Sequence, residues 1–203
     1  MTSMTAAELI RTRAPIAPAD VATIVDRVAA ELLCEWECHH RLHGAVQPDN
    51  IVVTFISGSV HTARLIGFVD PELAGTVLAR SGDVEPTVHV RDVHQKSYPA
   101  TESILGGRLD HRTDVYSLAC TAFELLTGLR PHGGGTVQDV MRSVIDGTAQ
   151  DLPLGTQAQR SVLRSAMAPD SAARPITALR FAADFRRAFH EDPTAAITIG
   201  TRP

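Results

Sequence analysis

The chain has 203 residues, of which 44% are hydrophobic and 21% charged, and its formal net charge is −4. This length suits one domain with a substantial core, and the balance of apolar and charged residues excludes wholesale disorder. The slight acidic excess provides no broad basic surface for phosphate backbones, so nucleic acid is not expected as a partner. No apolar run reaches the roughly 18 residues that indicate a membrane span. We therefore expect a cytoplasmic chain, or the cytosolic part of a larger protein, with no direct membrane insertion.

Helical periodicity dominates the sequence and predicts about six helices. The clearest segments are residues 18–42, 115–127, 137–145, 157–167 and 178–189. Pro18 suits a first helical turn, while Gly44 and Gly128 are typical of helix ends. Thr113 or Asp114 is expected to cap the segment 115–127. That segment is apolar around most of its circumference, so it should lie at the centre of the core.

Two short runs of strand-forming residues, Asn50–Phe55 and Thr62–Phe68, follow the first helix. The intervening Gly58 and its neighbouring serines favour a turn, which predicts a β-hairpin. Residues 70–99 show no sustained period and contain several prolines and glycines, as expected of a long surface loop. The fold class predicted is a mainly α domain with one small β-hairpin.

Five short motifs stand at the joints between these elements. In chain order they are "LHGAVQPDNIVV", "ARLIGFVD", "YPATESILGG", "DHRTDVYSLACTAFELLTG" and "APDSAARP". They resemble the catalytic loop, the Asp-Phe-Gly turn, the Ala-Pro-Glu end of the activation segment, the central helix and the Asp-x-x-x-Arg-Pro element of bacterial, actinobacterial-type serine/threonine protein kinases. The resemblance implies a kinase C-lobe-like domain at residues 18–190, which is α+β by family. Residues 1–17 would form an N-terminal segment in place of a kinase N-lobe, and residues 191–203 a flexible tail.

The same resemblance places unexpected residues where the family performs its chemistry. Phosphoryl transfer uses a carboxylate that accepts the hydroxyl proton, a lysine near the phosphate, and an Asp and an Asn that hold Mg²⁺. These positions fall, in that order, on Ala45, Gln47, Gly67 and Asn50. Only the vestigial Asn50 is kept, and neither a G-x-G-x-x-G loop nor a Val-Ala-x-Lys motif is present. We therefore predict a pseudokinase that is not an enzyme and has no cofactor. ATP binding is not expected.

Five further residues are expected to maintain the architecture by family resemblance. His43 and Phe68 would belong to the stack of side chains that links the two kinase lobes. Asp114 would anchor the backbone of the catalytic loop. Glu102 and Arg174 would form a buried ion pair, and breaking such a pair from one side costs about 3–5 kcal/mol.

The stretch "CEWECHHRLH" invites a zinc hypothesis, because Cys34, Cys38, His39, His40 and His43 are closely spaced. One helical turn cannot aim five groups at one ion, so no metal site is predicted. The alternative is that both cysteines are partly buried helix residues and that His39 and His40 are solvated or hydrogen-bonded locally. The three cysteines of the chain suit a reducing compartment.

Four threonines are candidate phosphorylation sites: Thr76, Thr87, Thr198 and Thr201. The alternatives are an undecorated loop and a disordered tail. A free C-lobe would also expose apolar area around His43, Phe68 and the hairpin, and such patches mark binding sites. Either residues 1–17 fold over this area, or another protein covers it.

We therefore predict a scaffold or regulatory module that binds a protein partner: an active kinase, a second copy, or a phosphothreonine-binding domain. The alternatives are a residual phosphoryl or nucleotidyl transferase that uses Asp49, Asn50 and Asp70, or a fragment of a larger kinase-like protein.

Overall fold

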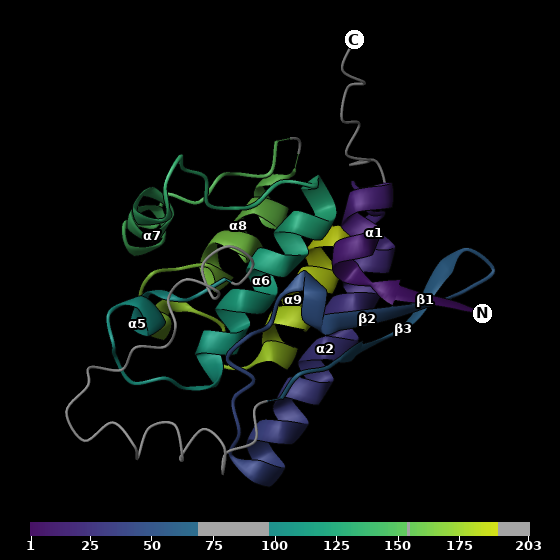
Figure 1. The fold of residues 1–203 in the computed structure, drawn as a ribbon, viewed down its shortest axis with the longest axis horizontal. Helices are drawn as coiled ribbons and strands as arrows, with labels where there is room; N and C mark the ends of the chain where they lie inside the picture. The colour runs from purple at the N-terminus through teal and green to yellow at the C-terminus, as the bar shows by residue number, and fades with distance from the viewer. Residues whose placement is uncertain (69–97, 154, 191–203) are drawn as a thin grey trace.

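The computed structural model describes residues 1–68, 98–153 and 155–190. Helices surround a central helix, and a three-stranded sheet lies at one end of the molecule (Figure 1). The elements are β1 (Thr2–Thr5), α1 (Ala6–Arg13), α2 (Pro18–His39), η1 (Pro48–Asn50), β2 (Ile51–Ile56), β3 (Ser59–Leu65), α5 (Thr101–Ile104), α6 (His111–Thr127), α7 (Val137–Ile145), α8 (Gln157–Ala166), η2 (Ser171–Ala173) and α9 (Ala178–His190).

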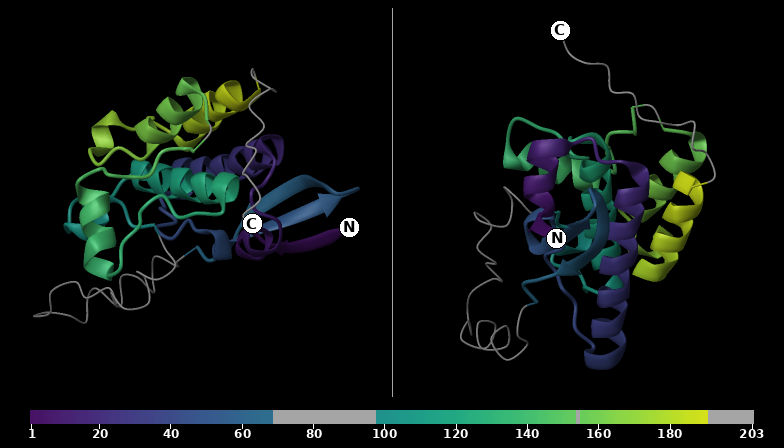
Figure 2. Two further views of the ribbon diagram at one scale, coloured as in Figure 1. Left: turned by 90° about the horizontal axis from the view of Figure 1, so that it is seen from above. Right: turned by 90° about the vertical axis from the view of Figure 1, so that its right-hand side faces the viewer.

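The central helix is α6, as its apolar circumference predicted, and most of its residues are buried. It packs against α2, α8 and α9, and α2 also packs along β3. The sheet and α7 lie at opposite ends of the molecule in two perpendicular views (Figure 1, Figure 2). In the described part of the chain, no helix is long and apolar enough to cross a membrane.

The N-terminal cap of α6 was wrongly predicted. Asp110 caps the helix and accepts a hydrogen bond from the Arg112 N–H. Thr113 and Asp114, the predicted caps, are buried inside the first turn. Both have cap-forming side chains, but those side chains bond to distant parts of the chain, which a local pattern cannot reveal. The predicted end at Gly128 is confirmed, with a φ of 71° that favours glycine.

The first long helix ends earlier than predicted. α2 stops at His39, and His40 adopts a left-handed conformation with a φ of 50°. The His40 N–H then bonds to the carbonyl oxygens of Glu35 and Trp36, which closes the helix without a glycine. Gly44 also has a positive φ, but it belongs to the following loop.

The hairpin is confirmed, and a third strand was missed. β2 and β3 are antiparallel and joined by Ser57 and Gly58, both with positive φ. β1 pairs with the other edge of β2. The segment Thr5–Glu8 forms a capping box that starts α1, whose Leu9 is buried. The threonine and glutamate spacing in "TAAE" was the sequence signal for this helix.

The sheet and α1 reduce the apolar exposure expected in this region. His43 and the hairpin residues Ile51 and Val53 are buried. β1 and α1, from residues 1–17, pack against β2 and η1, which is one of the two alternatives expected for this area. Ile56 and Ile66 remain exposed at the ends of the hairpin.

Candidate functional site

A single carboxylate holds the loop 43–50 against the central helix. Asp114 Oδ2 accepts a hydrogen bond from the His43 N–H at 2.9 Å, and Oδ1 accepts one from the Gly44 N–H at 2.8 Å. Burial raises the pKa of the Asp114 carboxyl above its ordinary value, and the two N–H donors offset part of that rise. The loop therefore starts from a fixed point on α6, at the residue that the resemblance indicated.

His43 connects this loop to the turn that follows β3. Its Nδ1 accepts a hydrogen bond from the Ala45 N–H at 3.2 Å, so its Nε2–H is the donor to the Ile66 carbonyl oxygen at 3.0 Å. This pairing assigns a neutral tautomer. The His43 ring also meets the Phe68 ring edge-on, with the ring centroids 4.6 Å apart. The structure thus brings the predicted pair His43 and Phe68 into contact.

Asn50 and Gly67 face each other beside the loop. The Asn50 Nδ2 donates to the Ala45 carbonyl oxygen at 2.9 Å. A Cβ atom at Gly67 would lie 3.7 Å from the Asn50 Oδ1, and Gly67 has a φ of +85° that favours glycine. A carboxylate at position 67 would therefore approach the amide oxygen of Asn50, but glycine supplies no ligand.

Ala45 and Gln47, the other two positions that the resemblance indicated, carry neutral side chains. Ala45 presents a methyl group, which cannot accept a proton. Gln47 is half-buried, and its Oε1 has no hydrogen-bond partner within the described residues. Any phosphoryl transfer at this loop would need another proton acceptor, and Asp49 is the exposed carboxylate of the loop.

Glu102 and Arg174 form the ion pair expected from the resemblance. Arg174 Nη1 and Nη2 donate to the two carboxylate oxygens of Glu102 at 2.7 and 2.8 Å. Burial opposes ionisation of Glu102, but hydrogen bonds from Arg174, from its own backbone and from Thr113 outweigh burial and lower its pKa. The pair ties the segment before α6 to the segment before α9.

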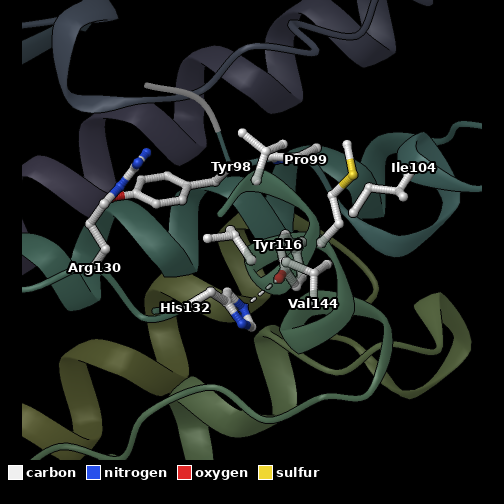
Figure 3. A pocket seen from close by; sticks show the side chains of 10 residues that line it. Tyr98, Pro99, Ile104, Tyr116, Arg130, His132 and Val144 are labelled. Carbon is white, nitrogen blue, oxygen red and sulfur yellow. Dashed lines mark hydrogen bonds between the residues drawn. The ribbon is translucent and has the colours of Figure 1, made fainter. Parts of the chain in front are cut away.

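A groove lies between α7 and the segment Tyr98–Ile104 (Figure 3). We call it the α7 groove; its walls also include Tyr116 of α6 and the loop residues Arg130 and His132. The Arg130 guanidinium lies 5.0 Å from the centroid of the Tyr98 ring. Most of the lining is apolar, and the sequence motifs gave no indication of it because its walls come from separate elements.

A buried histidine fixes the floor of the α7 groove. His132 Nε2 lies 2.7 Å from the Tyr116 hydroxyl (Figure 3). Its Nδ1 lies 2.9 Å from the Ser143 hydroxyl. Burial lowers the pKa of His132 to about 4, so the ring is neutral at physiological pH. This histidine connects α6 to α7.

The region of the zinc hypothesis carries no metal cluster among the described residues, where no three His, Cys, Asp or Glu side chains converge. Cys34 and Cys38 are exposed rather than partly buried. His39 and His40 are exposed as well.

Asp70, Thr76, Thr87, Thr198 and Thr201 lie outside the described residues. Their suggested roles stay predictions.

Comparison with known proteins identifies the family. Residues 9–179 match the family model of protein tyrosine and serine/threonine kinases. The chain is 37% identical over 124 residues to the serine/threonine-protein kinase PknF of Mycobacterium tuberculosis, covering 61% of this chain and 25% of PknF. It is 28% identical over 195 residues to PknD of the same species, covering 93% of this chain and 27% of PknD. It is 24% identical over 194 residues to PrkC of Bacillus subtilis, covering 93% of this chain and 28% of PrkC.

The solved structures confirm the kinase-like fold. The PknI kinase domain of Mycobacterium tuberculosis is similar with a TM-score of 0.62 at 24% identity, covering 93% of this chain and 63% of that domain. By contrast, the chain spans only about a quarter of the full length of the curated relatives PknF, PknD and PrkC.

These matches also correct one prediction. The prediction that the chain is not an enzyme is contradicted, because the matching family and the relatives are protein kinases.

Proposed function

Because the chain belongs to the protein tyrosine and serine/threonine kinase family, we propose that it acts in serine/threonine kinase signalling by binding a second kinase-family domain, in a scaffold or regulatory role. The observation that carries this proposal is the α7 groove, an apolar surface with defined walls. Exposed apolar surface of this kind tends to mark a binding site. The partner is another serine/threonine kinase domain or a second copy of this chain.

The amphipathic helix α7 supports this role. Within α7, Val144 is buried, while Val137 is 37% exposed and Ile145 is also exposed. Val140 and Met141, which line the groove, are half-buried. The apolar side of α7 is therefore only partly covered by its own chain, and a partner that covered the remainder would gain apolar burial.

The groove walls are also anchored to the kinase-like framework. The Ser117 hydroxyl of α6 donates to the Tyr98 carbonyl oxygen at 2.8 Å. The Arg174 guanidinium, which binds Glu102, lies 4.9 Å from the centroid of the Tyr116 ring. A partner would meet a surface that is already ordered, which lowers the entropic cost of association.

Sedimentation velocity tests this proposal with the purified chain, alone over a concentration series and mixed with a purified serine/threonine kinase domain. The diagnostic variant is Val137→Glu, at the edge of the α7 groove. The matched control is Ile176→Glu, which makes the same change at a site 61% exposed and outside the groove lining. We expect association that Val137→Glu weakens at least about tenfold and Ile176→Glu leaves intact. Absence of association, or equal weakening by both variants, would contradict the proposal.

Phosphoryl transfer is the second candidate function, and one observation favours it. Asn50 stands beside Gly67, and these are the two positions that the resemblance assigns to Mg²⁺ binding. The relatives are also named serine/threonine kinases. Kinase family membership also suggests ATP binding. Asp49 would be the proton acceptor and Asn50 a metal ligand, with Asp70 as a further carboxylate outside the described residues.

Transfer of labelled phosphate from ATP, with Mg²⁺ or Mn²⁺, measures this activity directly. Loss of transfer in both Asp49→Ala and Asn50→Ala, with Asp146→Ala as an exposed control, would support the assignment. Transfer that all three variants retain would exclude these two residues from the chemistry.

A further inference from the structure

Two thiols lie side by side on the surface near the end of α2. Cys34 and Cys38 are both exposed, and their sulfur atoms are 3.9 Å apart. Cys120, by contrast, is fully buried in α6. The exposed pair thus combines proximity with access to solvent, and neither property depends on the kinase-like site.

The geometry lies close to that of a disulfide. Residues four apart in an α-helix have Cα atoms about 6 Å apart, inside the range of about 4.4–6.8 Å found in disulfides. Their Cβ atoms lie about 5–6 Å apart, whereas a disulfide requires about 3.5–4.5 Å. The last turn of α2 must therefore tighten before the disulfide can form. Cys38 is followed by only one more helical residue, His39, so few helical hydrogen bonds oppose this movement.

We propose that Cys34 and Cys38 form a reversible intrachain disulfide when the protein meets a hydroperoxide. The Cys38 thiolate attacks the peroxide, an S–O bond forms, the O–O bond breaks and an alcohol or water leaves. The Cys34 sulfur then attacks the Cys38 sulfenic acid, the S–S bond forms and water leaves. The two thiols lose two electrons and two protons, and the peroxide gains them. A dithiol reductant reverses the reaction by exchange.

The rate of this reaction should depend on pH. The hydrogen bond with Cys38 and the repulsion between two neighbouring thiolates raise the pKa of the Cys34 thiol. Because the thiolate is the reactive form, the second step, in which the Cys34 sulfur attacks the Cys38 sulfenic acid, should become faster as the pH rises.

The disulfide would act on the start of the loop 43–50. Trp36 lies between the two cysteines in sequence, and its ring contacts His40 and His111 with centroid distances of 6.1 and 5.0 Å. Tightening the last turn changes these contacts immediately before the segment that enters the loop. Trp36 is the single tryptophan of the chain, so its fluorescence reports this movement.

Oxidation of the purified full chain with hydrogen peroxide tests the proposal. Trypsin cleaves after Arg27 and Arg41, so both cysteines fall in one peptide, Val28–Arg41. We expect this peptide to become lighter by about 2 Da, the mass of the two hydrogens lost, and to recover its mass with dithiothreitol. The Trp36 emission should change with the same reversibility. Cys120 should stay reduced.

Cys34→Ser and Cys38→Ser are the matched controls, because both positions are exposed and the substitution preserves size. Neither variant should show the lighter peptide or the reversible change in Trp36 emission. The proposal is overturned if the wild-type cysteines stay reduced, or if each is oxidised separately to a sulfinic or sulfonic acid. Disulfides only between chains would overturn it equally.

Discussion

Arg174 uses all five of its N–H groups to hold one side of the kinase-like framework. Two of its hydrogen bonds go to Glu102, at 2.7 and 2.8 Å, and the other three go to the carbonyl oxygens of Arg112, Ala168 and Pro169. The Arg174 side chain has no exposed surface, and that of Glu102 is 13% exposed. The pair is therefore buried with every arginine donor satisfied, which is the condition under which a buried ion pair is tolerated.

Removal of one partner of this pair should destabilise the fold strongly. We expect Glu102→Ala to lower the free energy of unfolding by about 3–5 kcal/mol, because it leaves a buried guanidinium without its counter-charge. Arg164→Ala is the control, since Arg164 pairs with Asp151 on the surface, and its loss should cost under about 1 kcal/mol. Urea denaturation of both variants gives the comparison. An equal loss of unfolding free energy in the two variants would show that the Glu102–Arg174 pair contributes no more than a surface ion pair.

The same pair should make the protein sensitive to acid. The pKa of Glu102 lies below its ordinary value of 4.5 in the folded state, so its stabilising contribution is complete above that value and is lost as pH falls through the folded pKa. We expect the stability of the wild type to fall more steeply in this acid range than that of Glu102→Gln, which cannot ionise. Parallel curves from urea denaturation across pH would contradict this prediction.

His132 should add a second dependence in a different pH range. Its pKa falls from 6.5 to about 4 on folding, so the unfolded chain takes up a proton first as pH decreases. Stability should therefore fall between pH 6.5 and about 4, by about 3 kcal/mol in total at 1.36 kcal/mol per pKa unit. His132→Gln, which lacks this titration, should show a flatter profile in that range. A profile unchanged by the substitution would argue against a buried neutral His132.

Asp114 should control the order of the loop 43–50. Asp114→Ala leaves the N–H groups of His43 and Gly44 without their acceptor, and leaving the buried His43 N–H unsatisfied costs about 1–3 kcal/mol. Asp114→Asn keeps one oxygen acceptor and should cost less. Hydrogen exchange at the Gly44 amide should be faster in both variants, and most in Asp114→Ala. Unchanged exchange at this amide would mean that Asp114 does not anchor the loop.

The sequence predicted those features that depend on local patterns. The central helix and the hairpin both follow from spacing within a short segment, and both are confirmed. The pairs His43–Phe68 and Glu102–Arg174 were available only from family resemblance, because their members are far apart in the chain.

The features that the sequence did not predict depend on contacts between segments that are far apart in the chain. β1 is too short to show a period, and it gains its structure by pairing with β2. Asp114 has the side chain of a helix cap, but its partners are the amides of a loop 70 and 71 residues away. The α7 groove is assembled from four separate segments, so no single stretch of sequence signals it.

The central claim is that the α7 groove is the face that binds a kinase-family partner. Backbone hydrogen exchange locates that face directly, measured on the wild-type chain free and saturated with a purified serine/threonine kinase domain, and on the chain alone at low and high concentration. The account predicts slower exchange in α7 and in residues 98–104 on association, with α9 and the sheet unchanged. Association that slows exchange at the sheet and leaves α7 unaffected would contradict it.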